Sequence, residues 1–584
     1  MSLSERRWAW PALAAVLIAA ISLRLWGVAQ GLPYVYNLDE SDHFVPHAVA
    51  MFGHGLNPHY FANPPALTYL LHLAFALWFG GAAGVRHAYA LHPQDVYVLA
   101  RVATALLGTA AVWLLYLVGS RLFDRAVGLL AAAIEAVAFL PVFYAHLALN
   151  DVPTLAPLTL SLLGSAGVLR RGRALDYVIA GVGLGLACAT KYTAGIVLLP
   201  LLAAIAVRYL ERDRDGAPGA GSAVALHVVA GIAIAGAAAL AAFLIANPYS
   251  LLDYHAFHSG LVHQTTVAGE AQGKLGAPEG GGLPYYLWSL TWGLGWVPAL
   301  AALGGAVTIW RRDRRLGWVL VPAPVLFLLF MGAQGRYFGR WLLPIFPLLC
   351  LLAAFFALEL ARSLAAWRPR IRTAAIALAA LGLCAQGVLY SVHSSLVLSR
   401  ADTRNLTRAW MLGNVPAGSR VVVEPVVPNA WVTDVGQGSP GGAGPRWVKY
   451  ASLRAVLNPA SGAPEPEGRK VRAEDYERTL SPALISYYEL HGFCWVVSGS
   501  TQSGRAFADP RAVPQAIAYY GALARRGRVV YRVSPYRAGH GPVPFGFDWS
   551  FDYYPLAYDR PGPQMTVYRL LGGRCAARPR PPAP

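Results

Sequence analysis

The sequence is built around repeated apolar runs of about 20 residues, and this pattern limits the possible folds more than any other feature. A run of that length crosses the hydrocarbon core of a bilayer as one helix. We predict eleven spanning helices, at residues 8–28, 97–119, 126–146, 153–169, 175–190, 193–208, 222–246, 285–309, 316–333, 341–361 and 371–393. The first run lacks a small-residue cleavage site, so we expect a retained helix rather than a signal peptide.

The charged residues fit a membrane protein and set its orientation. Only 13% of the 584 residues are charged, against about 25% in a soluble domain. The net charge of +18 is concentrated in short arginine-rich hinges between apolar runs, without a nucleic-acid-binding motif, so nucleic acid is not an expected partner. The hinges contain Arg121, Arg125, Arg170, Arg171, Arg173, Arg208, Arg212, Arg214, Arg311, Arg312, Arg314, Arg315, Arg368, Arg370 and Arg372.

The positive-inside rule places these hinges in the cytoplasm. Eleven crossings from a cytoplasmic N-terminus satisfy every hinge and leave the segment after about Arg400 outside. The apolar stretch 65–80 does not fit this count, because a crossing there would reverse every later hinge. We expect it to lie along the outer membrane face or to re-enter the membrane. An ordinary spanning helix, with an error elsewhere in the count, is the alternative.

The composition changes sharply near residue 400, which predicts two domains: a transmembrane domain at 1–399 and an extracytoplasmic α/β domain at 400–584. In the second domain we expect strands at 420–424, 493–498, 528–533 and 566–570, helices at 474–491 and 511–526, and loops at 436–446 and 458–468. Cys494 and Cys575 both fall in this domain, where a single disulfide between them is compatible with an oxidising compartment.

The first outer loop carries the run Asn-Leu-Asp-Glu-Ser-Asp-His at 37–43, with carboxylates at Asp39 and Glu40. A carboxylate beside the membrane is able to take the proton of an acceptor hydroxyl or to bind a cation. An acidic helix N-cap is the alternative interpretation. His43 and His47 stand one helical turn apart and would be able to join Asp39 in a metal site. A solvated helix face is the favoured interpretation, and we expect no metal or cofactor.

Five further residues on the predicted outer face are candidates for the site: one carboxylate, three cations and one tyrosine. Cations at a membrane boundary are suited to hold an anionic phosphate. Snorkelling to lipid headgroups is the alternative for the cations, and capping of the next helix is the alternative for the carboxylate. The residues are the carboxylate Asp151, the cations Lys191, Arg336 and Arg340, and Tyr337 between the two arginines.

Several of these motifs resemble a known family. The run from Asn37 to Leu71, with Asp39-Glu40, Gly55 and Pro64-Pro65, resembles the first outer loop of GT-C superfamily glycosyltransferases, above all protein O-mannosyltransferases and lipid A aminoarabinose transferases. The segments 100–132, 146–153, 190–195 and 336–349 resemble further family motifs, in the same order, so the resemblance spans about 8–365. Aminoarabinose transferases carry Glu-Lys just before the two prolines, whereas this chain has Ala62-Asn63, which weakens a role in lipid A modification.

The resemblance implies a multi-pass enzyme of a bacterial cell membrane that uses a polyprenyl-phosphate-linked sugar on the extracytoplasmic face. Asp39 matches the family's catalytic acid, Glu40 its partner and Asp151 the second acidic position, while Lys191 and Arg336 match basic positions near the donor phosphate. The expected partners are this donor, membrane lipids and an acceptor hydroxyl on a protein, a lipid or a cell-envelope glycan.

Two alternatives to a glycosyltransferase remain open from the sequence. A transporter or flippase of lipid-linked sugars would show charges at mid-membrane and inverted repeats, and neither is visible in the sequence. A non-catalytic role in envelope assembly, with the outer domain as the working part, is the second alternative. We therefore predict an α-helical polytopic membrane glycosyltransferase of GT-C type with a C-terminal α/β domain.

Overall fold

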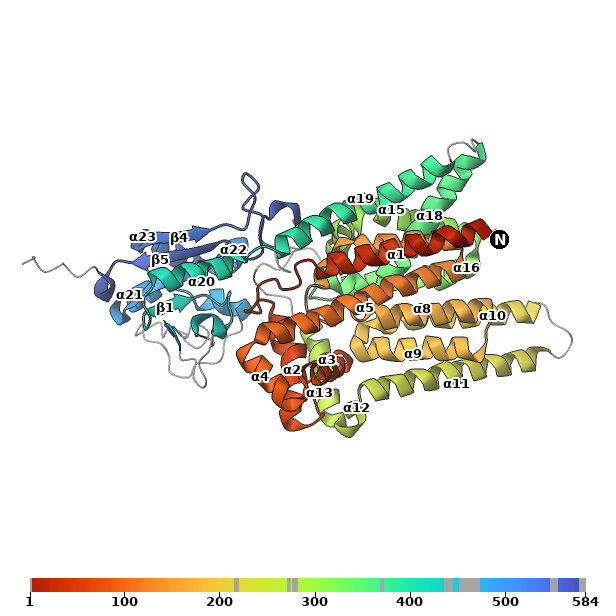
Figure 1. Cartoon of the computed structure of the whole chain (residues 1–584), viewed down its shortest axis with the longest axis horizontal. Coiled ribbons are helices and arrows are strands. Elements are labelled where there is room, and N and C mark those ends of the chain that lie inside the picture. The colour runs from red at the N-terminus through yellow and green to blue at the C-terminus, as the bar shows by residue number, and fades with distance from the viewer. Residues whose placement is uncertain are drawn as a thin grey trace, which may run out of the picture.

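In the computed structural model, a long helical bundle carries a smaller α/β domain at one end (Figure 1). The structure describes residues 3–214, 220–269, 275, 282–367, 372–434, 445–450, 473–546 and 555–576. The chain starts at the end of the bundle that lies far from the α/β domain (Figure 1). The predicted loop 458–468, and all but the last two residues of the predicted loop 436–446, lie outside the described residues.

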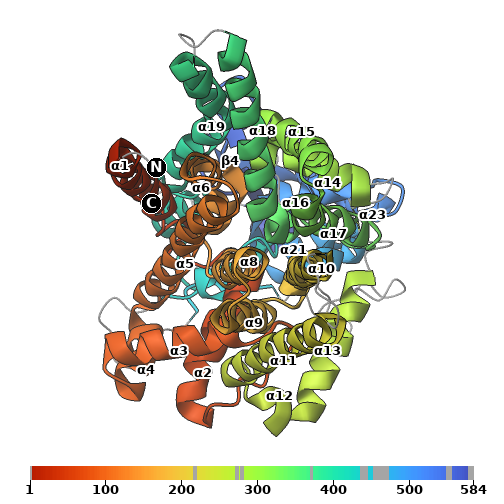
Figure 2. The same cartoon turned by 90° about the vertical axis from the view of Figure 1, so that its right-hand side faces the viewer.

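The bundle helices run along the molecule and are seen end-on in Figure 2. They are α1 (Leu3–Leu25), α5 (Pro93–Leu122), α6 (Arg125–Val137), α7 (Phe139–Tyr144), α8 (Leu155–Arg170), α9 (Ala174–Thr190), α10 (Leu198–Arg214), α11 (Ala220–Ala246), α14 (Gly282–Leu290), α15 (Trp296–Arg312), α16 (Arg314–Leu320), α17 (Pro322–Gly332), α18 (Phe346–Trp367) and α19 (Arg372–Leu398). Buried Leu, Val, Ala and Phe side chains from most of them form one continuous core.

The helices occupy all eleven predicted ranges, but not all of them are long enough to be counted as spans. Seven described helical segments are long and apolar enough to cross a membrane, or eight if one bent pair is counted as a single span. Shorter apolar helices at Ala9–Leu25, Leu155–Arg170 and Ala174–Thr190 fill three other predicted ranges. The molecule is therefore a multi-pass membrane protein, and the count of eleven stays a prediction.

The predicted span 126–146 is divided into α6 and α7, and Pro141 explains why. Proline has no amide hydrogen, so Pro141 cannot donate to the carbonyl of Val137 four residues earlier. The Ser391 hydroxyl donates to that carbonyl instead, at 2.8 Å. The Arg24 guanidinium donates to the neighbouring carbonyl of Ala136 at 3.0 Å. Side chains from α1 and α19 thus supply the hydrogen bonds that a broken helix in a membrane needs.

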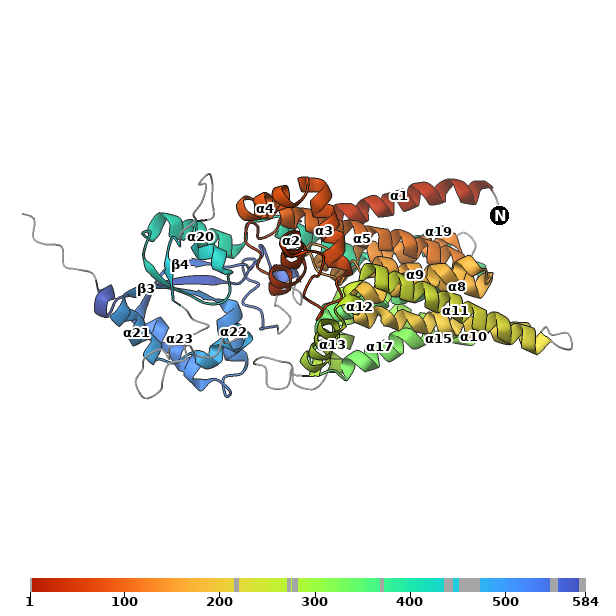
Figure 3. The same cartoon turned by 90° about the horizontal axis from the view of Figure 1, so that it is seen from below.

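The segment predicted at 65–80 forms α3 (Ala66–Phe79), which lies across the end of the bundle rather than along it (Figures 2 and 3). Gly80 and Gly81 both have positive φ and let the chain bend by 94° into α4 (Ala82–Leu91). Together with α2 (Val45–His54), α12 (Tyr249–Leu252) and α13 (Tyr254–Gly269), these helices form a layer beside the α/β domain. The bent pair α3–α4 is long and apolar enough to count as one broken span, so the position of 65–80 along the membrane face stays a prediction.

The hinge residues that the structure describes lie at helix ends far from the α/β domain, where α5 ends at Leu122, α8 at Arg170 and α15 at Arg312. The Arg121 guanidinium donates to the carbonyl of Leu163 at 3.0 Å, and Arg208 donates to the carbonyl of Leu169 at 3.3 Å. The Leu169 carbonyl lies in the last turn of α8, where a helix has unpaired acceptors and a negative dipole end. The cations therefore stabilise helix ends as well as marking one face of the membrane.

The α/β domain contains a five-stranded sheet with the order β2-β1-β3-β5-β4. Strand β1 is parallel to β2 and β3, and β5 is antiparallel to β3 and β4. The strands are β1 (Arg420–Val423), β2 (Val448–Lys449), β3 (Phe493–Gly499), β4 (Gly527–Val533) and β5 (Met565–Leu570), and the helices are α20 (Thr403–Asn414), α21 (Ala483–His491), α22 (Ser500–Ala508) and α23 (Pro514–Arg526). All four predicted strands are present, whereas β2, α20 and α22 were not predicted.

Both faces of this sheet are covered. Val422 and Val496 point into one core, which also contains residues of α21 and α23. Val421, Val423 and Val497 point into the other core, beneath α20. This is the two-residue alternation expected of a strand, and Figure 3 shows α20 on one side of the sheet and α21 and α23 on the other. Cys494 and Cys575 form a disulfide that fixes the chain after β5 to β3.

Glu424, at the end of β1, is buried completely beneath this sheet. Its carboxylate accepts hydrogen bonds from the Ser498 hydroxyl at 2.9 Å, the Gly499 amide at 2.8 Å and the Tyr520 hydroxyl at 2.9 Å. Burial raises the pKa of this carboxyl to about 7, against an ordinary value of 4.5, although the three hydrogen bonds favour the ionised form. The folded domain therefore favours the protonated acid.

We predict that Glu424 makes the α/β domain less stable as the pH rises. The protonated Glu424 carboxyl adds to the free energy of unfolding of the domain. This contribution is complete below the unfolded-state pKa of 4.5 and is lost as the pH rises through about 7, a change of about 3 kcal/mol. Hydrogen exchange of β1 and β3 peptides in the purified full chain, measured from pH 5 to 8.5 and corrected for intrinsic exchange, will report it. Glu424→Gln should flatten the pH dependence, and an unchanged slope would contradict the prediction.

Candidate active site

Asp39 and Glu40 lie in the first turn of a helix that starts at residue 38, within the first outer loop. The side-chain oxygen of Asn37 accepts a hydrogen bond from the Glu40 amide at 3.1 Å, which caps this turn. The turn continues through a short π-helix, Glu40–Phe44, into α2. Neighbouring residues on a helix point in directions about 100° apart. Asp39 consequently faces a cavity, whereas Glu40 faces the core of the bundle.

Glu40 is completely buried and forms a two-point ion pair with Arg101 of α5, at 2.7 and 2.8 Å. The same carboxylate accepts the amide of Ala148 at 2.8 Å. The third nitrogen of Arg101 donates to the carbonyls of Val28 and Gln30, each at 2.8 Å. This pair joins α5, the chain after α1, the first loop and the turn after α7. Glu40 is not among the described residues that line the cavity.

A chain of alternating charges runs through the site. Arg340 donates to Asp39 at 2.7 Å and lies 3.6 Å from Asp151. The other oxygen of Asp151 is paired with the Lys191 ammonium. Asp151 follows α7, Lys191 ends α9, and Arg340 lies in the 3₁₀ turn Gly339–Ile345. Three distant segments thus supply a connected chain of charges that begins at Asp39.

The Asp39 carboxylate is the most exposed member of this chain, with 40% of its side chain accessible. Burial of the rest of the group would raise its pKa, but the Arg340 guanidinium, a hydrogen bond from His43 and the more distant Arg336 outweigh burial. The pKa of Asp39 is therefore held well below its usual range, and the group is an anion at physiological pH.

Arg336 and Tyr337 have different places, although they are neighbours in the sequence. Arg336 lines the cavity with its guanidinium carbon 5.1 Å from the centre of the Phe338 ring. Tyr337 packs against the rings of Tyr285 and Tyr286 on α14, with centroids 5.0 and 6.3 Å away. Tyr337 lies outside the set of described residues that line the cavity, so its contacts are those of a supporting residue.

His43 and His47 both stack on the ring of Tyr60, with centroid distances of 5.1 and 4.6 Å. His43 Nε2 lies 3.5 Å from Asp39, whereas His47 Nδ1 lies 3.1 Å from the carbonyl oxygen of Pro58. In the part of the chain that the structure describes, no group of three or more His, Cys, Asp or Glu side chains is arranged to hold a metal ion. The metal site considered for Asp39, His43 and His47 is thus not assembled.

The charged residues form one end of a cavity of about 1010 Å³. Its polar part contains Asp39, Asp42, His43, Asp151, Lys191, Arg336 and Arg340. Its apolar part contains Ile196, Leu261, Phe327, Phe330, Met331 and Trp341. Phe327, Phe330 and Met331 belong to the membrane-spanning helix α17. A cavity with a charged end and an apolar wall on a membrane helix suits an amphiphile with an anionic headgroup.

Sequence reasoning identified five of the charged residues that the fold brings together: Asp39, Asp151, Lys191, Arg336 and Arg340. It did not identify Arg101 as the partner of Glu40. A signal was present, because Arg101 lies near the start of the otherwise apolar run 97–119, and ionisable residues in such runs are costly unless paired. It also missed Tyr60, which is aromatic and carries no spacing pattern that would mark it.

The contrast between the two neighbouring carboxylates gives a stability prediction. Removing one partner of a buried ion pair leaves an uncompensated charge, which typically costs about 3–5 kcal/mol. Glu40→Gln should therefore lower the unfolding temperature of the purified protein clearly, because the Arg101 guanidinium loses its counter-charge. Asp39→Asn is the matched control and should change that temperature little. Equal unfolding temperatures for both variants would contradict a structural role for the Glu40–Arg101 pair.

Comparison with known proteins gives one family match. Residues 62–234 match the family model described as dolichyl-phosphate-mannose-protein mannosyltransferase. The comparison with curated proteins found no match.

Solved structures show a similar fold over most of the chain. The oligosaccharyltransferase AglB from Archaeoglobus fulgidus, solved with an inhibitory peptide and a dolichol-phosphate, is 14% identical at a TM-score of 0.51, covering 96% of this chain and 78% of that chain. The apo form of the Archaeoglobus fulgidus oligosaccharyltransferase is 13% identical at 0.50, with the same coverage. ArnT from Cupriavidus metallidurans bound to undecaprenyl phosphate is 15% identical at 0.43, covering 72% and 82%. The chain is therefore similar to this mannosyltransferase family over residues 62–234, and it shares its overall fold with the Archaeoglobus fulgidus oligosaccharyltransferase.

Proposed function

We propose that the protein transfers a sugar from a polyprenyl-phosphate-linked donor to an acceptor hydroxyl. The observation that carries this proposal is the position of Arg340, which contacts both Asp39 and Asp151 at the charged end of an amphiphilic cavity. Two comparisons support the class of donor. The matching family model is named for a dolichyl-phosphate-mannose donor, and the AglB structure contains a dolichol-phosphate.

In this proposal the donor phosphate binds to the cations of the site. Lys191, Arg336 and Arg340 all line the cavity, and charge-assisted hydrogen bonds to phosphate are stronger than neutral ones. The polyprenyl chain lies along the apolar wall formed by α17. Because Asp39 and Asp151 already neutralise Arg340 and Lys191, the phosphate competes with these carboxylates for the same cations.

That competition gives Asp39 its role. A carboxylate held by Arg340 is a weak base, since general bases work best with a pKa near the operating pH. When the phosphate draws Arg340 toward itself, the pKa of Asp39 rises and the carboxylate turns to the acceptor hydroxyl. The acceptor oxygen then bonds to the anomeric carbon, its proton moves to Asp39, and the sugar–phosphate bond breaks with its electron pair on the phosphate. The polyprenyl phosphate leaves with the added charge stabilised by the cations.

The other predicted residues support this centre. Asp151 orients Lys191 and Arg340, and Glu40 holds the first turn through Arg101. We place the site and the α/β domain on the extracytoplasmic face of a bacterial cell membrane, in contact with membrane lipids. The disulfide between Cys494 and Cys575 supports an oxidising compartment for that domain. The arginine-rich hinges at the other end of the bundle support a cytoplasmic location for that end.

The direct test supplies purified protein with a panel of polyprenyl-phosphate sugars and a mixture of protein, lipid and glycan acceptors. Mass spectrometry then shows which donor is consumed and which acceptor gains a sugar. We expect one donor to be consumed and free polyprenyl phosphate to accumulate in equal amount. Transport of an intact lipid-linked sugar across a vesicle membrane, without its cleavage, would replace this proposal with the flippase alternative.

Asp39→Asn should reduce turnover by about 10²–10⁴-fold, the usual contribution of a general base, because an amide cannot accept the acceptor's proton. Turnover is measured with the donor found in the panel. Asp42→Asn is the matched control, since Asp42 also lines the cavity and is exposed, and it should keep nearly the parent rate. An Asp39→Asn variant within threefold of the parent rate would remove Asp39 from the mechanism.

Arg336→Ala and Lys191→Ala should each weaken donor use by about 1–3 kcal/mol, the value of a charge-assisted contact. The loss should appear in the KM for the donor or in the rate at saturating donor. Arg86→Ala serves as the control, because Arg86 lies on α4 at the same end of the bundle and is not among the described cavity residues. Parent-like kinetics for both test variants would reduce Lys191 and Arg336 to anchors for lipid headgroups.

A further inference from the structure

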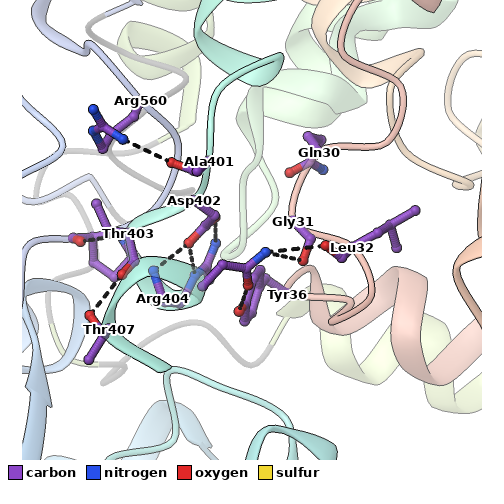
Figure 4. A network of polar contacts seen from close by, with 12 residues as sticks. Gln30, Gly31, Leu32, Tyr36, Ala401, Asp402, Thr403, Arg404, Thr407 and Arg560 are labelled. Atoms are coloured by element: carbon purple, nitrogen blue, oxygen red, sulfur yellow. Dashed lines mark hydrogen bonds and ion pairs between the residues drawn. The ribbon is translucent and has the colours of Figure 1, made fainter. Parts of the chain in front are cut away.

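Helix α20 of the α/β domain holds the chain that leads from α1 to Asp39 (Figure 4). The Asn405 side-chain amide donates to the carbonyls of Gly31 and Leu32, each at 3.2 Å. Its side-chain oxygen accepts a hydrogen bond from the Tyr36 hydroxyl. Three hydrogen bonds therefore connect one asparagine of the second domain to three residues of the first loop.

The guanidinium of Arg404 lies over the face of the Tyr36 ring. Its guanidinium carbon lies 3.6 Å from the centre of the Tyr36 ring, within the range of a cation–π contact. The guanidinium is itself fixed by two hydrogen bonds to Asp402, at 2.9 and 2.7 Å. Asp402 also caps α20 by accepting the amide of Arg404 at 2.8 Å. The guanidinium thus has one orientation, set by the start of the helix.

The position of α20 is in turn set by the α/β domain. The Thr403 amide donates to the carbonyl of Pro561 at 3.0 Å, and its hydroxyl donates to the carbonyl of Pro563 at 2.6 Å. These prolines directly precede β5, so the first turn of α20 is tied to the sheet (Figure 4). Contacts between α20 and the first loop therefore fix the loop relative to the α/β domain.

Tyr36 also packs against the core beneath α20, and a small cavity adjoins it. A cavity of about 130 Å³ lies between the two domains and is lined by Tyr36, Asn37 and Arg404, among others. Side chains beside a void lose the contacts that would otherwise hold them. The hydrogen bonds and the ring contact from α20, together with this packing, determine where Tyr36 lies.

Only Asn37 separates Tyr36 from the helical turn that contains Asp39. Asn37 caps that turn through the Glu40 amide and through its own carbonyl, which accepts the Ser41 amide at 3.0 Å. Glu40 anchors the turn to Arg101 and to the Ala148 amide, and Arg340 holds Asp39 from the bundle side. Tyr36, four residues before Glu40, adds an anchor on the side of the α/β domain.

We propose that Arg404 and Asn405 are positioning residues, through which the α/β domain fixes Tyr36 and so aims Asp39 at the reacting centre. The catalytic part of this inference rests on the proposed function of Asp39. The structural part is independent of it, because it concerns only the order of the segment that carries Asp39. A misplacement of a catalytic group by about 1 Å typically reduces rates by about 10²-fold.

Hydrogen exchange of the full-length protein, without any substrate, tests the structural part. Tyr36→Phe removes one hydrogen bond and keeps the ring, so exchange in peptides that cover 36–44 should become about 2–10-fold faster. Asn405→Ala removes three hydrogen bonds and should have a larger effect on the same peptides. The two substitutions share one hydrogen bond, so their effects in the double variant should be less than additive.

Arg400→Ala is the matched control. Arg400 lies two residues after the end of α19 and pairs with Asp559 of the α/β domain, with a hydrogen bond of 2.8 Å to the Asp559 carbonyl. It therefore loosens the junction of the two domains without touching the first loop. Exchange should become faster near Asp559 and stay unchanged over 36–44. Equal exchange over 36–44 in the parent protein, Tyr36→Phe and Asn405→Ala would overturn the proposal.

Kinetics test the catalytic part, with the donor found in the panel. Asn405→Ala should lower kcat by about 10–100-fold and leave the KM for the donor within about twofold, because the phosphate-binding cations are not displaced. Asn405→Asp keeps the acceptor for Tyr36 and should recover part of the rate. If exchange becomes faster but kcat does not fall while Asp39→Asn is inactive, the positioning role is wrong. If Asp39→Asn is fully active, the proposed function fails and the exchange result still stands.

Discussion

The buried pair of Glu40 and Arg101 is the interaction on which the site depends. Two charges inside a membrane bundle are costly unless each finds its counter-charge and its remaining hydrogen bonds. Here the carboxylate accepts two bonds from Arg101 and one from the Ala148 amide, so both of its oxygens are satisfied. Because the pair fixes one residue of a helical turn, its neighbour Asp39 has to point the other way, into the cavity. A structural ion pair thereby sets the direction of a functional carboxylate.

The same balance of charge explains how the cations Arg340 and Lys191 remain close together. Arg340 and Lys191 are held by Asp39 and Asp151, so the positive groups are oriented before an anion arrives. Preorganised charge of this kind needs little rearrangement during a reaction. The carboxylates also lower the affinity for any anion, because binding has to displace them. Such a site favours ligands that contribute further binding energy, which the apolar wall of the cavity is able to supply.

The sequence predicts local features of this chain well and pairings poorly. The length of each apolar run predicted the helices, and short runs rich in valine predicted the strands around Val422 and Val496. The division of the span 126–146 followed from Pro141, whose missing hydrogen bond is replaced by Ser391 from a helix about 250 residues later. Partners at such distances leave no periodic trace. For the same reason the pairing of Arg101 with Glu40, 61 residues earlier in the sequence, was not predicted.

The junction of the two domains shows a further limit of sequence patterns. The first turn of α20 contains Asp402, Thr403 and Arg404, a composition typical of a solvated helix start. In the structure all three are buried: Arg404 lies over the Tyr36 ring of the first loop, Asp402 holds Arg404, and Thr403 donates to carbonyls just before β5. A junction at the end of a membrane bundle has few apolar side chains to offer, so directional hydrogen bonds define it instead. Hydrogen bonds lose strength steeply with small changes in geometry, and a polar junction therefore specifies the position of Tyr36, and of the turn beyond it, more narrowly than an apolar contact of the same size.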